Sequence, residues 1–380
     1  MQSFKFFGKF FLAAALIFAL LSFNWDRIEL ENRAFVITIG IDATDEEGQP
    51  FEVSMSIADT KAMEKDGQES PDTMRSARGE SLAHAMGQTE TATSDKIYFG
   101  HTKAVVLGEG LLKSEKLLKE TIDTLARNNE INIKAIVMAT NKKAAEILEA
   151  KPKEQDLLGV YLSSFYNNNN ANPAAAAVKL DLEGLDSQLL NSESALIPKI
   201  TLEEGEGEDK TTAISGVAVV RDFALAGYIE EEAMRGFLWL MENGAGTRIP
   251  IEVEGGHVTF LTAKSKPKLS FYEEDGRLNC LVKLKAQGSI QGASSDKAID
   301  ASSIAAWQED FAKKIKTEIE ESFDILRTEF AIDGLGIKDL LRKKERDLYQ
   351  EYGSDWSKTF EHMSLVTDIE VLITNTGSTK

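Results

Sequence analysis

The first 25 residues constrain this chain more than any other segment. Lys5 and Lys9 are the only charged residues before Asp26, and the run from Phe10 to Trp25 is uncharged and mostly apolar. At ~1.5 Å per residue this run spans about 24 Å as a helix, and the apolar residues before it extend the span toward the ~30 Å of a bilayer core. A basic stretch followed by an apolar stretch is typical of an export signal, which places everything after Asp26 outside the cytoplasm.

The last residues of this segment decide whether it is removed. A signal peptidase requires small residues just before the cut, and the stretch Phe18–Phe23 offers poor candidates. Processing as a lipoprotein requires a cysteine, and none precedes Cys280. We therefore expect residues 1–25 to be an uncleaved membrane-anchor helix. A cleaved signal peptide and a buried core helix are the alternatives.

The rest of the chain has the composition of a folded, acidic protein. Its 380 residues predict two or three domains, and 43 Lys and Arg against 62 Asp and Glu give a formal charge of −19. A chain this acidic repels phosphate backbones, so we expect no nucleic-acid partner. The single cysteine, Cys280, can form neither an internal disulfide nor a cysteine zinc site, and we expect it in the core.

Residues 26–202 alternate apolar strands with amphipathic helices, which is typical of α/β or α+β structure and could comprise two subdomains. We expect strands at Arg33–Asp42, Phe51–Ile57, Lys103–Leu107 and Ile131–Ala139, and helices at Thr73–Gln88, Glu109–Asn128 and Lys142–Ala150. The Gly-rich acidic run 203–210 predicts a linker between two domains. A cation site is the alternative for this run, but it lacks the spacing of a known calcium loop.

Residues 211–380 predict a second, α+β domain in which helices cover one face of an antiparallel sheet. We expect strands at Thr211–Val220, Arg248–Val253, His257–Ala263, Lys268–Tyr272, Leu278–Ala286 and Met363–Thr374, and helices at Glu230–Met241, Ser303–Phe330 and Ile337–Tyr352. The predicted fold class is therefore α+β, with several domains of mixed sheets and packed helices after the anchor helix. Trp356 follows the last of these helices, and we expect it to pack across the helix–strand junction; the alternative is an exposed contact with a partner.

The sequence contains no recognisable catalytic, cofactor-binding or metal-binding pattern. The four histidines, His84, His101, His257 and His362, are too far apart in the sequence to form a metal pair on one helix. Neither a G-x-S-x-G elbow nor a phosphate-binding loop with G-x-x-x-x-G-K-[ST] occurs. We therefore predict a protein that is not an enzyme and has no cofactor.

Several short stretches, taken in order, resemble the Ger(x)C family, the C subunits of spore germinant receptors. These stretches are Trp25-Asp26 with Ile39-Gly40-Ile41-Asp42, Tyr98-Phe99-Gly100-His101-Thr102-Lys103 with Val105–Glu109, Pro198-Lys199-Ile200 with Ser215–Val219, and Asp333-Gly334-Leu335-Gly336 with Asp355-Trp356. The motif positions, whose roles the resemblance does not define, are Trp25, Asp26, Gly40, Asp42, Gly100, His101, Gly216, Gly334, Gly336 and Trp356.

The resemblance implies a subunit of a nutrient germinant receptor that assembles with multi-spanning membrane subunits on the outer face of the spore inner membrane. It implies three small domains of mixed sheet and helix and no known catalytic residues. Members of the family usually carry a lipid-modified cysteine directly before the Trp-Asp pair, whereas this chain has Asn24 there. The uncleaved helix would replace the lipid as the anchor. The alternative functions are an extracytoplasmic protein that binds a small molecule and, third, an exported hydrolase; whether this chain contacts a small molecule is left open.

Overall fold

The structure is a computed structural model that describes residues 33–58, 72–91, 95–150, 157–167, 178–204, 210–241, 244–294 and 299–376. The expected anchor helix, residues 1–25, and the motif residues Trp25 and Asp26 lie outside this range. Within the range, no helix combines the length and the apolar character needed to cross a bilayer.

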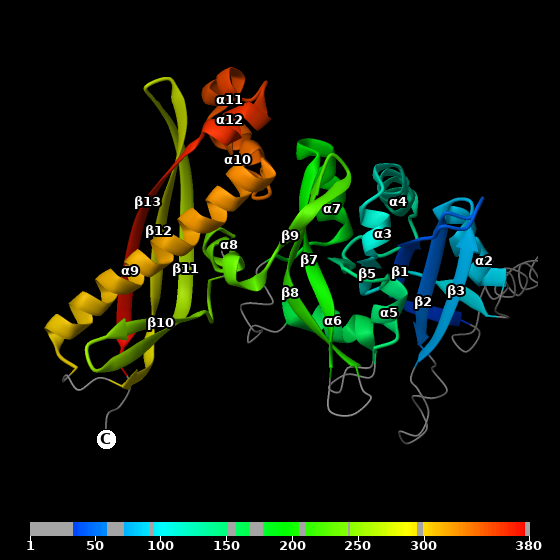
Figure 1. Cartoon of the computed structure of the whole chain (residues 1–380), viewed down its shortest axis with the longest axis horizontal. Helices are drawn as coiled ribbons and strands as arrows, with labels where there is room; N and C mark the ends of the chain where they lie inside the picture. Colours follow the sequence, from blue (N-terminus) through cyan, green and yellow to red (C-terminus); the bar gives the residue numbers. More distant parts are fainter. Residues whose placement is uncertain are drawn as a thin grey trace, which may run out of the picture.

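The first of two sheets has nine strands in the order β3-β2-β1-β5-β6-β7-β8-β9, with β4 also paired to β1 (Figure 1). The centre is parallel, because β1, β5, β6 and β7 pair in that sense, and both sides are antiparallel. Its strands are β1 Arg33–Ala43, β2 Phe51–Ala58, β3 Asp72–Gly79, β4 Lys96–Tyr98, β5 Ala104–Leu107, β6 Ile136–Ala139, β7 Ser194–Glu204, β8 Lys210–Arg221 and β9 Ala224–Ile229.

Helices pack on both faces of the first sheet. One hydrophobic core lies between the sheet and α2 (Leu82–Thr91), α3 (Glu109–Leu112), α4 (Glu115–Arg127) and α7 (Leu182–Ser192). The other lies between the sheet and α5 (Ala144–Leu148) and α6 (Leu158–Asn167). Alternate residues of β5 belong to opposite cores, so the whole strand is buried and shows no polar face.

The second sheet has the order β10-β11-β12-β13, with β10 Arg248–Val253, β11 Gly256–Glu274, β12 Arg277–Ser294 and β13 Ser364–Asn375. The long helix α9, Ala301–Asp324, crosses one face of it (Figure 1). Phe311, Ile315 and Ile319 of α9 are fully buried in the same core as Phe260 and Cys280. Cys280 is fully buried, which confirms its role as a core residue, and this burial raises the pKa of its thiol to about 12.

Shorter helices complete this half of the chain. The 3₁₀ turn Glu231–Met234 leads into α8, Arg235–Leu240, and a π-helical turn at Ile325–Phe330 ends α9. The segment α10 Ile337–Lys344, α11 Arg346–Tyr352 and α12 Trp356–His362 then connects α9 to β13, which pairs parallel to β12. The expected antiparallel meander is therefore a mixed sheet, and the α+β class is confirmed.

Several sequence-based expectations are wrong in detail. The strands expected at His257–Ala263 and Lys268–Tyr272 are one strand, β11, and the helix expected at Ile337–Tyr352 is divided into α10 and α11. The helix expected at Thr73–Gln88 begins only at Leu82, because residues 72–79 pair with β2 as strand β3. The helix expected at Glu109–Asn128 is two helices, since the Ser114 hydroxyl accepts the backbone N–H of Leu117 and starts a new helix. Ser54 and Ser56 alternate with apolar residues along β2, which is the pattern of a strand with one polar, exposed face. Both are nevertheless buried, and they bond to Ser76 and Asp72 of β3.

The acidic run 203–210 lies in a different setting from the expected inter-domain linker. Strands β7 and β8, on its two sides, pair antiparallel from Ser194↔Arg221 to Glu204↔Lys210. The run therefore connects two neighbouring strands of one sheet rather than two separate sheets. The change from the first sheet to the second comes later, between β9 and β10. A division of the chain into domains at this run stays a prediction.

Candidate functional site

A polar cleft of about 570 Å³ lies at the junction of the two halves and is the candidate functional site. The end of α7 with the neighbouring ends of β7 and β8 forms one side, and the segment between α9 and α10 with the start of α12 forms the other. Its lining is mainly polar, with hydroxyl, amide, carboxylate and cationic groups. It comprises Leu190, Asn191, Ser192, Glu193, Ser194, Arg221, Asp222, Ala331, Ile332, Asp333, Lys338, Ser354, Asp355, Trp356, Ser357 and Phe360.

Asp333 organises the second side of the cleft. Its carboxylate accepts the backbone N–H groups of Ile337 and Lys338, at 2.9 and 2.7 Å, and so caps the first turn of α10. It also accepts the indole N–H of Trp356 at 3.1 Å. Burial raises the pKa of Asp333, while these hydrogen bonds oppose that effect by stabilising the carboxylate.

Trp356 is buried, with 8 % of its surface exposed, and its ring lies against Phe360 with a centroid distance of 6.2 Å. The burial of Trp356 agrees with the expected core position, but the residue begins α12, and this helix separates it from β13. That it packs across a helix–strand junction stays a prediction. Sequence reasoning missed its partner, Asp333, although the residue opens the Asp-Gly-Leu-Gly stretch.

Two glycines of the same stretch, Gly334 and Gly336, allow the backbone to pack and turn at the junction of the two halves. A Cβ on Gly334 would lie 2.7 Å from Cγ of Leu196 in β7, so a glycine here lets the second half approach the first sheet. Gly336 has φ +70°, in the left-handed region that favours glycine, and precedes α10. The Arg221 side chain, from β8, donates to the backbone oxygen of Phe330 at 2.8 Å and joins the halves on the same side.

Gly40 and Asp42 lie together elsewhere, on β1. The Asp42 carboxylate accepts the backbone N–H groups of Ala144 and Ala145, at 2.7 and 3.0 Å, and caps α5 across 102 positions of sequence. Gly40 faces the same helix, because a Cβ there would lie 3.2 Å from Cβ of Ala144. Asp42 is 2 % exposed, and burial raises its pKa against the effect of the two hydrogen bonds.

Gly100 and His101 form a third location, beside the start of β1. The rings of Phe35, Tyr98 and His101 contact one another edge to face, with centroids 5.1 to 5.8 Å apart. The guanidinium of Arg33 lies 5.5 Å from the centre of the Tyr98 ring. A Cβ on Gly100 would collide with that ring, at 2.6 Å from its hydroxyl oxygen, and His101 is exposed. We call these four side chains, Arg33, Phe35, Tyr98 and His101, the aromatic cluster.

Gly216 marks a fourth location, in β8, where φ is +87° and a Cβ would meet the backbone of Ile229. Nearby, the buried Lys199 ammonium donates to both carboxylate oxygens of Glu230 at 2.7 Å and lies 5.2 Å from the Tyr228 ring centre. The structure therefore distributes the described motif positions over four places, and of these positions only Trp356 lines the cleft.

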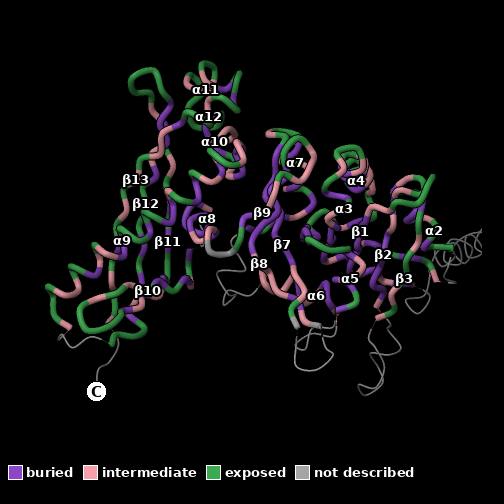
Figure 2. Tube along the Cα trace, viewed as in Figure 1, coloured by how far each residue is buried: buried purple, intermediate pink, exposed green. Residues whose placement is uncertain are grey.

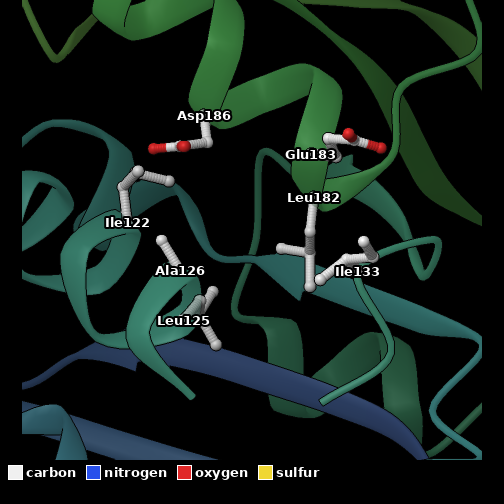
Figure 3. Close-up of a pocket in the computed structure, with 7 residues that line it drawn as sticks. All are labelled: Ile122, Leu125, Ala126, Ile133, Leu182, Glu183 and Asp186. Carbon is white, nitrogen blue, oxygen red and sulfur yellow. The ribbon is translucent and has the colours of Figure 1, made fainter. Parts of the chain in front are cut away.

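A second, smaller pocket of about 120 Å³ lies between α4 and α7 (Figure 3). Its wall is aliphatic, and two carboxylates stand at its rim. The lining residues are Ile122, Leu125, Ala126, Ile133, Leu182, Glu183 and Asp186. Its volume is below the ~300–1,000 Å³ of typical small-molecule sites.

Among the described residues, no group of three or more His, Cys, Asp or Glu side chains is arranged to hold a metal ion. His84, His101, His257 and His362 are exposed and lie on different elements or turns. The carboxylates that line the cleft are Glu193, Asp222, Asp333 and Asp355. Of these, Asp333 already accepts hydrogen bonds from three N–H donors.

Two family models match the chain. The model described as "Spore germination protein N-terminal domain" matches residues 26–202, and "Spore germination B3/GerAC like, C-terminal" matches residues 215–377. The first match contains the first sheet up to β7, and the second contains most of β8 and all of the second sheet.

Similarity to individual proteins supports these family matches. Spore germination protein B3 of Bacillus subtilis (strain 168) is 21% identical over 386 residues, covering 98% of this chain and 98% of that protein. Spore germination protein KC of the same organism is 23% identical over 380 residues, covering 93% and 92%. The crystal structure of the GerBC protein aligns with a TM-score of 0.61 at 18% identity, over 91% of this chain and all of that one. At this identity the structural likeness shows the fold.

Proposed function

Because the chain belongs to the family of GerAC-like spore germination proteins, we propose that it is a non-enzymatic subunit of a nutrient germinant receptor. It acts by assembly: residues 1–25 hold it to the membrane, and its exported part packs against multi-spanning subunits of the same receptor. Its location is the outer face of the spore inner membrane.

One observation carries the proposal: the two germination-protein domains match the chain in order and together cover 26–202 and 215–377. The similarity to protein B3 extends over 98% of both chains, so it is not limited to one of the two domains.

In the part of the chain that the structure describes, the cleft and the smaller pocket favour assembly over the binding of a small apolar ligand. A receptor for such a ligand requires a preformed apolar pocket with a few converging polar groups. The larger cavity has a mainly polar lining, and the apolar one has only about 120 Å³. A role in holding receptor subunits together fits these two cavities better than the binding of a small apolar ligand.

The aromatic cluster is the surface we assign to the contact with the membrane subunits. Seven residues, 26–32, separate Arg33 from the anchor segment, and an extended chain of that length spans at most about 25 Å. The cluster therefore lies close to the bilayer if the anchor is in place. Tyr98 is 38 % exposed, and exposed aromatic side chains with a neighbouring arginine are typical of the residues that dominate interfaces.

Purification from spore membranes tests the proposal. A tagged chain is expected to co-purify with multi-spanning receptor subunits after detergent extraction, and the double variant Tyr98→Ala/His101→Ala is expected to lose most of that recovery. Tyr272→Ala, a partly exposed tyrosine on β11, is the matched control and keeps it. Recovery of the wild-type chain without any membrane subunit would refute the assembly role. Equal recovery with the double variant would refute only the assignment of the surface.

A further inference from the structure

The second sheet has one covered face and one open face. Residues of β13 that point to the covered face contact α9, as when the Thr367 hydroxyl donates to Glu320 at 3.4 Å and Gln308 accepts the backbone N–H of Ile373 at 3.0 Å. Along β11 and β12, buried and exposed residues alternate, so the exposed set belongs to the opposite face (Figure 2).

Lysines dominate the middle of the open face. Lys264, Lys266 and Lys268 of β11 and Lys283 and Lys285 of β12 are all exposed. The register places Lys266 directly opposite Lys285 and Lys268 directly opposite Lys283. We call these five residues the lysine face. The chain has a formal charge of −19, so a surface with five lysines close together has the opposite sign of charge from the chain as a whole.

Two of these five lysines have an acidic partner within the sheet. On β13, Glu370 pairs with Lys285 at 2.5 Å and Asp368 lies 3.9 Å from Lys283. The three lysines of β11 have no ion-pair partner among the residues that the structure describes. Like charges directly opposite each other on neighbouring strands destabilise a sheet, so an anionic partner on this face would relieve the repulsion.

The shape and borders of the lysine face fit a flat partner. The face is the surface of a sheet, and the same side of β13 carries two exposed aliphatic residues, Val366 at 38 % and Leu372 at 43 % exposure. They stand opposite Leu281 and Gln287, at the two ends of the lysine rows. Lysine side chains with aliphatic neighbours are typical of surfaces that rest in the headgroup region of a bilayer.

We propose that the lysine face docks on the anionic phospholipid headgroups of the membrane to which the chain is attached, with Lys264, Lys266 and Lys268 making the contact. This inference rests on the membrane location proposed above. It adds a second contact, because β1 and the second sheet lie at opposite ends of the long axis of the molecule (Figure 1). Docking at both ends would lay the molecule along the bilayer and fix which faces its partners can reach.

The test uses the full chain reconstituted with vesicles of phosphatidylcholine, alone or mixed equally with phosphatidylglycerol. A cysteine at Gln287, on the open face, carries a fluorophore that lipid-borne quenchers reach only at the membrane surface. A cysteine at Lys314, on the exposed side of α9, is the reference position. The native Cys280 is buried with a raised pKa and does not react.

We expect quenching at Gln287 with the anionic vesicles only, reversed by high salt, and none at Lys314. The triple variant Lys264→Gln/Lys266→Gln/Lys268→Gln should lower the ratio of docked to undocked protein by about a hundredfold, at roughly a factor of five per lysine. The control variant Lys313→Gln/Lys314→Gln/Lys316→Gln, with its label at Gln287, changes the net charge equally and should still dock. Its three lysines are exposed on α9.

The outcomes separate the two proposals. A chain that fails to stay with neutral vesicles lacks the anchor, which refutes the membrane location. A chain that stays with both kinds of vesicle but shows no quenching at Gln287 refutes the lysine face. Protection of Gln287 only when membrane subunits are added also refutes it, because the partner is then an acidic protein segment. The triple variant should unfold at the same or a higher temperature than wild type, since the repulsion between strands decreases.

Discussion

Asp42 and Asp333 each cap the start of a helix, one in each half of the molecule, but their surroundings differ. Each is a buried carboxylate that accepts two backbone N–H groups from the first turn of a helix, α5 or α10. Asp42 lies on β1 of the first sheet, and its helix, α5, packs on that sheet. Asp333 also holds the indole of Trp356, lines the polar cleft and lies next to Gly334, which contacts Leu196 of the other half. One aspartate thus stabilises a single packed unit, and the other stabilises the junction of two.

The largest effect is expected from Trp356. Trp356→Ala should lower the free energy of unfolding by about 3–5 kcal/mol, because a buried aromatic ring is removed and Asp333 loses a donor. Trp356→Phe keeps most of the ring and should cost about 1–2 kcal/mol, which isolates the hydrogen bond. Urea denaturation measures both, and an unchanged midpoint for Trp356→Ala would mean that this side chain is not part of the core.

The two aspartates can be compared directly by isosteric replacement. Asp333→Asn should cost about 3 kcal/mol and Asp42→Asn about 2 kcal/mol at neutral pH, because three donors depend on the first carboxylate and two on the second. Both variants are measured by denaturant unfolding. A larger loss at Asp42 would show that the junction contributes less than the packing of α5 on β1.

Substitution of two glycines by alanine tests the same difference between the Asp42 site and the junction. Gly108→Ala should cost about 2–3 kcal/mol, because its Cβ would collide with the Asp42 carboxylate, which is fixed by two hydrogen bonds. Gly334→Ala should cost about 1–2 kcal/mol, since its neighbour is the Leu196 side chain, which can adjust. Thermal unfolding of the two variants gives the order, and the reverse order would mean that the junction is the more rigid of the two sites.

The smallest effect concerns pH. Burial raises the pKa of Asp42 and of Asp333 above 3.8, so the folded state binds more protons than the unfolded state between 3.8 and each raised pKa. This contribution to stability is fully present below 3.8 and is lost as the pH rises through the folded-state pKa. The difference in unfolding free energy between wild type and Asp333→Asn should therefore widen as the pH falls through this window. Urea denaturation at a series of pH values measures it, and a difference that narrows would contradict a raised pKa.

The sequence predicted most elements whose own residues determine them. The residue pattern was sufficient to predict the long helix α9 and the strands β10, β12 and β13 of the second sheet. Helices α6, α7 and α12 and strands β4, β7 and β9 were missed, since their patterns are short or weak. Strand β3 was mistaken for part of a helix because its partner, β2, decides its conformation.

The candidate site was harder to predict from the sequence than these elements. The order of its short motifs was sufficient to predict the family and to single out Asp333-Gly334-Leu335-Gly336 and Trp356, but nothing in it paired Asp333 with Trp356 or Asp42 with α5. These contacts join residues 23 and 102 positions apart, and packing of complete elements brings them together. The alternation Lys264, Lys266, Lys268 is likewise plain in the sequence. Only the tertiary structure decided that α9 covers the other side of that strand, because a strand has two faces and its neighbours alone determine which one meets solvent.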